Sequence, residues 1–247
     1  MTKRKKQYNK KKNVLIISDT QFPFEHPDYL DFCKAVQRKY LCGTVVHIGD
    51  IADCLNFSFY EKDPEAPTIL EEVEMLKTSF DAWGKAFPKV QAVVGNHDNR
   101  VRRRLDSAGF PHELLPTEKV FRDLLGLPKG WSFQDKVVLN TRRGQVYCLH
   151  GDQKGSSVVA GTTARKIGTS LIRGHHHTKS FITYISTPHH LIFDMIVGCG
   201  IDKNAVAFKY DKKQIDRPIL SCGVILDGVP HIIPMELDSD GNWLGNL

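Results

Sequence analysis

A short polar run, Gly95-Asn96-His97-Asp98, directly follows the apolar stretch 90–94. The apolar stretch predicts a short buried strand, and Gly95 predicts a turn at its end. The amide, imidazole and carboxylate that follow provide a metal ligand, a proton donor and a group to orient that donor. Ligands of open α/β sheets bind at the carboxyl ends of the strands, so these residues are the first candidates for a site. A turn that carries a surface histidine is the plain alternative.

Two earlier apolar stretches also end in a carboxylate. The stretch 14–17 is followed by Ser18 and Asp19, and the stretch 45–48 is followed by Gly49 and Asp50. Helical spacing of apolar residues over 27–40 and over 68–87 separates the three predicted strands. This alternation predicts parallel pairing with right-handed crossovers, which brings the three polar ends to one edge of one sheet.

From Trp131 onward the pattern changes to short strands. The strand predicted over 145–149 ends at His150, and the strand predicted over 171–173 ends at Gly174-His175-His176-His177. His175 and His177 point in the same direction if the chain is extended there. Antiparallel strands are predicted for the rest of the chain, over 181–186, 191–197, 219–226 and 229–234.

The polar strand ends offer carboxylates, imidazoles and an amide oxygen, without a thiolate. This set suits Mn²⁺, Fe or Zn²⁺ better than a structural zinc site built from cysteines. The candidates are too many for one four-coordinate ion and suit two ions about 3.5–4 Å apart. We therefore expect two divalent ions, with Mn²⁺ as the first choice. The polar strand ends are Asp19, Asp50, Asn96-His97-Asp98, His150, His175 and His177.

In their order, these blocks resemble a calcineurin-like metallophosphoesterase of the small bacterial and phage type. That family carries Asp-x-His, Gly-Asp, Gly-Asn-His-Asp/Glu, His and Gly-His-x-His. The resemblance covers residues 14 to 177. It implies an α/β fold, a four-layer α/β/β/α sandwich of two mixed sheets, with the C-terminal strands in the second sheet. The blocks of this chain are Asp19-Thr20-Gln21, Gly49-Asp50, Gly95-Asn96-His97-Asp98, His150 and Gly174-His175-His176-His177.

The resemblance also implies a role for each matching residue. A metal-bridging hydroxide would attack phosphorus in line with the leaving oxygen. His97, oriented by Asp98, would protonate the leaving group. The implied ligands are Asp50 as the bridge, Asp19 and His177 at the first ion, and Asn96, His150 and His175 at the second.

Gln21 departs from the family pattern, because it stands where the family usually has the histidine of Asp-x-His. A neutral amide oxygen is a weaker ligand than imidazole for a first-row transition metal. Three outcomes are open: Gln21 ligates weakly, water replaces it, or the first ion is loosely held. We expect a reduced affinity at the first site, and activity that high Mn²⁺ restores.

An arginine cluster, Arg100 and Arg102–Arg104, follows the central block. Arg100 is two residues beyond Asp98, so we expect it to bind a substrate phosphate with bidentate geometry. The other arginines are expected to fan around a helix, at least one of them facing solvent. Asp53, three residues after Asp50, is expected to cap or orient its own segment.

The N-terminal residues 1–12 hold seven basic residues and no acidic one, whereas the net charge of the whole chain is +6. The remainder is therefore near neutral. We expect residues 1–12 to be a disordered tail, followed by a single domain over 13–247. Such a tail suits electrostatic binding to nucleic acid, and a merely solubilising end is the equal alternative.

The cysteines and the hydropathy pattern indicate the cellular compartment of the protein. Six cysteines show no CxxC pairing, which favours a reducing cytosol and no cysteine metal site. No apolar run approaches the roughly 20 residues of a membrane helix. The basic N-terminus has no apolar segment behind it, unlike a secretory signal. We expect a cytoplasmic protein without a membrane partner.

The sequence thus predicts metal-dependent hydrolysis of a phosphoester, with a phosphodiester as the favoured substrate. The basic tail and the arginines favour nucleic acid or a nucleotide, as in a nuclease. Two alternatives use the same residues or fewer. The first is a phosphomonoesterase or protein phosphatase. The second is a non-catalytic binding protein with a first metal site weakened by Gln21.

Overall fold

The structure is a computed structural model of the chain. It describes residues 13–59, 63–111, 113–153, 156–202, 204–205 and 217–247. The basic tail expected over 1–12 lies outside the described residues. Among the described helices, none is both long enough and apolar enough to cross a membrane.

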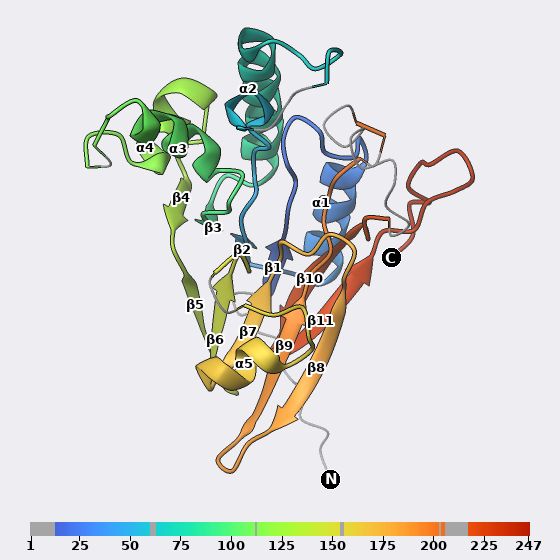
Figure 1. Cartoon of the computed structure of the whole chain (residues 1–247). Coiled ribbons are helices and arrows are strands. Elements are labelled where there is room, and N and C mark those ends of the chain that lie inside the picture. The colour runs from blue at the N-terminus through green and yellow to red at the C-terminus, as the bar shows by residue number, and fades with distance from the viewer. Residues whose placement is uncertain (1–12, 60–62, 112, 154–155, 203, 206–216) are drawn as a thin grey trace.

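The first sheet has a parallel centre and an antiparallel edge (Figure 1). Strands β1 to β4 run parallel, and β10 pairs antiparallel with β1 and with β11. The order is β11-β10-β1-β2-β3-β4. The strands are β1 (Val14–Ile17), β2 (Thr44–His47), β3 (Val90–Val93), β4 (Trp131–Gln134), β10 (Ser221–Leu226) and β11 (Val229–Pro234).

The second sheet has the order β5-β6-β7-β9-β8. Its three central strands, β6, β7 and β9, run parallel, and the two edge strands run antiparallel to them. The carboxyl ends of β6 and β7 are therefore at the same edge. The strands are β5 (Val137–Thr141), β6 (Gly144–Leu149), β7 (Ser170–Arg173), β8 (Phe181–Ser186) and β9 (Leu191–Ile196).

Helices cover the outer face of each sheet. The longest of the described helices, α2, begins at a capping box, in which Thr68 and Glu71 satisfy each other's backbone N–H groups. The helix on the second sheet is short and spans Thr162–Ile167. The helices are α1 (Tyr29–Lys39), η1 (Leu55–Phe57), α2 (Ile69–Ala86), α3 (Asn99–Ser107), α4 (Thr117–Val120), η2 (Phe121–Leu125) and α5 (Thr162–Ile167).

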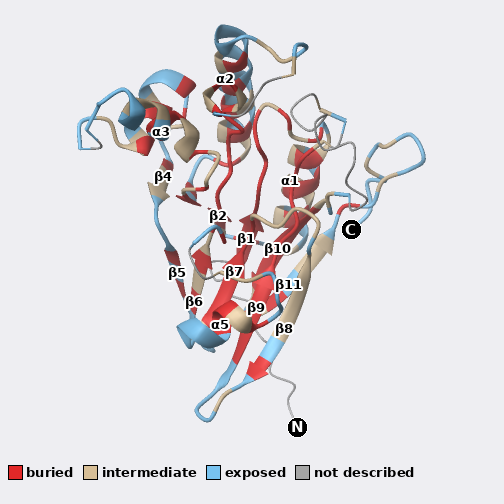
Figure 2. Ribbon diagram, in the orientation of Figure 1, coloured by how far each residue is buried: buried red, intermediate tan, exposed pale blue. Residues whose placement is uncertain are grey.

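Alternation along β1 shows how the layers form. Leu15 and Ile17 pack against the helices, whereas Val14 and Ile16 pack between the two sheets. Both sets are buried, as the continuous red strands of Figure 2 show. A strand buried on both faces reads as an uninterrupted apolar run, which explains the sequence of β1. The expected four-layer α/β/β/α sandwich of two mixed sheets is confirmed.

The expected position of the last strands was wrong in part. Strands β8 and β9 lie in the second sheet, but β10 and β11 complete the first, with Val14 opposite Ile225. In addition, β9 runs parallel to β7 and not only antiparallel to β8. Apolar alternation identifies a strand but not its partner, and the free edge of β1 was a partner that the pattern did not reveal.

Candidate metal centre and active site

The candidate site lies where the carboxyl ends of parallel strands from both sheets meet. Strands β1, β2 and β3 lead to Asp19, Asp50 and Asn96, while β6 leads to His150. The sheets are joined there directly, because Nδ1–H of His150 donates to the carbonyl oxygen of Ile48, 3.0 Å away. The parallel order predicted from the sequence therefore brings distant segments together.

Two groups of candidate ligands share one carboxylate. Asp50, His150 and His175 form the first group, and Asp19, Asp50 and His177 form the second. Within each group the potential ligand atoms all lie within 4.8 Å of one another. Asp50 belongs to both, which is the arrangement that a carboxylate bridging two ions requires.

Asn96 lies beside the histidine pair of one group. Its Oδ1 is 3.0 Å from Nε2 of His150, and that nitrogen is 3.1 Å from Oδ2 of Asp50. Both oxygens thus converge on Nε2, the ring nitrogen that remains available because Nδ1 is hydrogen-bonded to Ile48. The hydrogen bond at Nδ1 leaves Nε2 as the ligand atom of a neutral His150.

Gln21 lies at the other group. Its side chain is completely buried, and its Nε2 is 3.3 Å from Nε2 of His177, which also faces Oδ1 of Asp19 at 3.1 Å. None of the described residues donates a hydrogen bond to its Oε1. A buried amide oxygen without a partner is costly, and a cation would satisfy it. Gln21 is therefore in place to be a ligand.

Other features of the pocket also fit cations. Oδ2 of Asp50 is buried and lies 3.1 Å from Nε2 of His150. Burial opposes a charged imidazole, but Asp50 and Asp19 outweigh burial and raise the pKa of His150 to about 10. The carboxylates thus favour positive charge here, and a metal ion would replace the proton. The donor set of carboxylate, imidazole and amide oxygen suits divalent ions.

Glycines make room for this packing. A Cβ at Gly95 would collide with the side chain and backbone nitrogen of Asp50, and one at Gly174 would collide with Ser18 and Asp19. The glycines before the central and last polar blocks are therefore steric requirements of the site. Several ligand positions also adopt left-handed backbone, with positive φ at Asp19 (45°), Gln21 (48°), Asp50 (52°) and His175 (69°). Non-glycine residues rarely adopt this region, and such strain concentrates at functional sites.

The carboxylate that contacts His97 is Asp53, and this corrects the expected pairing with Asp98. Oδ1 of Asp53 is 2.7 Å from Nδ1 of His97. Asp98 instead accepts backbone N–H groups of Ile51 (3.0 Å), Ala52 (3.1 Å) and Gly95 (2.8 Å). Asp98 therefore fixes the two loops that carry Asp50 and Asn96, and Asp53 orients the imidazole.

The charge state of His97 follows from these carboxylates. Burial opposes its charged form, but Asp50 and Asp53 outweigh burial, so the pKa of His97 is raised. Its backbone N–H also donates to Oδ1 of Asp50, at 2.8 Å. The imidazole is thus held beside the shared carboxylate of the two ligand groups, where a proton donor would be useful.

The sequence model of the family described as "Calcineurin-like phosphoesterase" matches residues 12–182, which is more than half of the chain. The chain belongs to the calcineurin-like phosphoesterase family. It is accordingly a metal-dependent phosphoesterase, a hydrolase of phosphoesters. No curated protein matches it in sequence.

Solved structures resemble this phosphoesterase only distantly. An archaeal phosphodiesterase is 15% identical, with 90% of this chain and 99% of the other covered and a TM-score of 0.45. The phosphoesterase YfcE from E. coli is 16% identical (94% and 97% covered, TM-score 0.44). Vps29 from Chaetomium thermophilum is 12% identical (94% and 93% covered, TM-score 0.49). Similarity at this level says nothing about the substrate of this chain.

The arginine cluster of the phosphoesterase divides into different roles. Arg100 donates to the carbonyl and the carboxylate of Asp53 (2.8 and 3.2 Å), and its NH2 is 3.2 Å from Nε2 of His97. Arg102 is buried and donates to the carbonyl oxygens of residues 110 and 115, so it holds a loop. Arg100 thus lies at the site, where it contacts the expected proton donor; its binding to a substrate phosphate stays a prediction.

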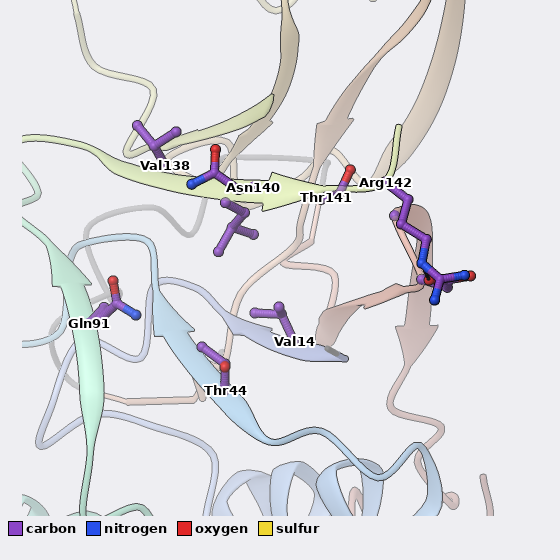
Figure 3. Close-up of a pocket in the computed structure, with 10 residues that line it drawn as sticks. Val14, Thr44, Gln91, Val138, Asn140, Thr141 and Arg142 are labelled. Atoms are coloured by element: carbon purple, nitrogen blue, oxygen red, sulfur yellow. Dashed lines mark ion pairs between the residues drawn. The ribbon is translucent and has the colours of Figure 1, made fainter. Parts of the chain in front are cut away.

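A separate cavity of about 400 Å³ lies at the opposite end of the strands. Figure 3 shows Val14 and Thr44, the first residues of β1 and β2, on one side of it and strand β5 on the other. An ion pair of Arg142 with Asp227, 3.4 Å long, borders the cavity. The cavity is therefore distinct from the edge that carries the candidate ligands.

Proposed function

We propose that this chain hydrolyses a phosphodiester with two divalent ions bound at the shared edge of its sheets. The observation that carries the proposal is the position of Asp50 in both ligand groups. The proposed ligands are Asp50 for both ions, Asp19, Gln21 and His177 for the first ion, and Asn96, His150 and His175 for the second.

The chain's own residues would divide the remaining work. When bound, divalent ions supply a water of lowered pKa and offset the charge on the phosphoryl oxygens. Nε2 of His97 would donate a proton to the leaving oxygen, while Asp53 holds Nδ1 and keeps the ring in place. The guanidinium of Arg100 would turn from Nε2 of His97 to a phosphoryl oxygen of the substrate.

Mn²⁺ is the proposed ion, with Fe or Zn²⁺ as alternatives, because the ligand set mixes hard oxygens with imidazole. A cytoplasmic location is proposed as well. All six cysteines are buried and unpaired, which suits a reducing compartment.

The test compares bis-p-nitrophenyl phosphate with p-nitrophenyl phosphate in a series of Mn²⁺ concentrations, with Asp50→Ala as the control. We expect the diester to be hydrolysed with the higher kcat/KM. Hydrolysis of the monoester alone would favour the phosphomonoesterase alternative. Hydrolysis of neither, by a protein that binds one ion or none, would favour the non-catalytic alternative suggested by Gln21.

A further inference from the structure

A second arginine of α3 lies at the rim of the candidate site. Arg103 is exposed, and its NH2 donates to the carbonyl oxygen of Asn96, 2.9 Å away. It follows Arg100 by three positions on the same helix, so the two side chains are neighbours on one face. The guanidinium of Arg100 therefore lies inside the site, and that of Arg103 lies just outside it in solvent.

An exposed aromatic ring continues this surface. The side chain of Phe59 is 59% exposed, although phenylalanine is usually buried. The guanidinium carbon of Arg104 lies 3.8 Å from the ring centroid, and Nε of Arg104 donates to the carbonyl oxygen of Phe57 at 3.0 Å. The arginine thus fixes one face of the ring against the protein, and the exposure leaves ring surface for another planar group.

The spacing suits a chain of nucleotides. Arg100 and Arg104 are four residues apart, or about 6 Å along the axis of α3. A phosphate that contacts Arg100 would therefore place its neighbour near Arg103 and an adjoining base near Phe59. Aromatic rings bind unpaired bases by stacking, and arginines bind phosphates, with little dependence on sequence. A base within a duplex is already stacked and paired, and so cannot use the ring.

We propose that Arg103, Arg104 and Phe59 form a binding surface for the nucleotide next to the cleaved phosphate of a single-stranded nucleic acid. This inference rests on the proposed function, because it assigns the substrate of the same site. The surface favours a single strand over a duplex and over a phosphorylated peptide, which offers one phosphate and no base.

Binding can be measured without turnover in the Mn²⁺-loaded protein with His97→Ala. A fluorescein-labelled oligothymidylate of about 12 nucleotides is the probe, and anisotropy is the readout. We expect Phe59→Ala to weaken binding about fivefold or more, the equivalent of one stacked base. We expect Arg103→Ala to reduce the salt dependence by about 0.7 in the slope of log K against log salt.

Two exposed residues on other elements serve as matched controls. Tyr184 of β8 is a half-exposed aromatic residue, and Arg165 of α5 is an exposed arginine. Alanine substitutions at these positions should leave oligonucleotide affinity unchanged. Circular dichroism melting of each variant verifies that it is folded.

Equal affinity of Phe59→Ala, Arg103→Ala and their parent would overturn the inference, as would tighter binding of a duplex or of a phosphopeptide. The nitrophenyl esters separate this failure from failure of the proposed function. A wild type that hydrolyses the diester but does not bind the oligonucleotide refutes only the binding surface. A wild type that hydrolyses neither ester refutes the proposed function.

Discussion

Asp53 and Asp98 both lie near His97, but we expect replacement by asparagine to impair catalysis at one position and stability at the other. Asp53 contacts the imidazole, whereas Asp98 contacts only backbone N–H groups in the described hydrogen bonds. Replacing either aspartate by asparagine keeps the shape and removes the charge. The pair Asp53→Asn and Asp98→Asn therefore separates orientation of the proton donor from support of the loops.

Asp53→Asn should impair catalysis. The change removes the negative charge at Nδ1 of His97 and one partner of Arg100. General acid catalysis contributes typically 10²–10⁴-fold, so we expect kcat to fall about 100-fold for an alkyl phosphodiester, whose leaving group needs a proton. The kcat for the p-nitrophenyl diester should fall far less, because p-nitrophenolate leaves without needing a proton.

Asp98→Asn should impair stability. Its single remaining oxygen cannot accept all three N–H groups, and the new NH₂ would face at least one of them. A buried unsatisfied group costs about 1–3 kcal/mol. For a chain of this size, each kcal/mol lowers Tm by about 2–4 °C. The ratio of activity on the two esters should stay as in wild type.

The assay is kcat on both esters in saturating Mn²⁺, together with Tm by calorimetry. The reasoning would be refuted if Asp98→Asn selectively lost activity on the alkyl ester at unchanged Tm while Asp53→Asn kept it. That result would restore Asp98 as the residue that orients His97.

Three further outcomes follow from packing and ligation. Gly95→Ala should lose Mn²⁺ affinity in isothermal calorimetry, because its Cβ would displace Asp50; unchanged affinity would contradict the steric argument. Arg173→Met should lower the urea-unfolding free energy by about 3–5 kcal/mol, since it leaves the fully buried Asp194 unpaired, and adding Asp194→Leu should recover part of the loss. Gln21→His should tighten the weaker Mn²⁺ site, and equal affinity in calorimetry would exclude a weakened first site.

Much of the site could be predicted because its residues follow strands directly. Asp19, Asp50 and Asn96 come just after apolar runs, and parallel order fixes the edge at which such runs end. His150 and His175 were likewise predicted at strand ends, and the structure places those strands, β6 and β7, in the second sheet. The apolar runs predict where the strands end, and the geometry of a parallel sheet predicts that these ends lie close together.

The pairing of Asp53 with His97 could not be predicted in this way. Asp53 lies in a loop that turns at Cys54, whose φ is 52°, before η1 begins. No periodic pattern describes such a turn, so the direction of the Asp53 side chain was not readable. The one signal was a second acidic residue three positions after Asp50, close enough to share its loop. Adjacency in sequence favoured Asp98, but its oxygens are turned toward the backbone.

The sheet to which β10 belongs could not be predicted from the sequence, for a different reason. Its apolar residues satisfy a strand pattern in either sheet, and only the unpaired edge of β1 decides between them. Long-range pairing of this kind depends on the whole fold. The roles of the arginines were likewise fixed by tertiary contacts, since Arg100 and Arg102 differ only in the direction that their helix gives them.

The central claim is that Asp50 joins two metal sites. The most direct measurement is the number of Mn²⁺ ions per chain, located by anomalous diffraction from crystals grown at saturating Mn²⁺. The account predicts two ions on either side of the Asp50 carboxylate, and loss of both in Asp50→Ala. A single ion, or two ions that do not share Asp50, would contradict it.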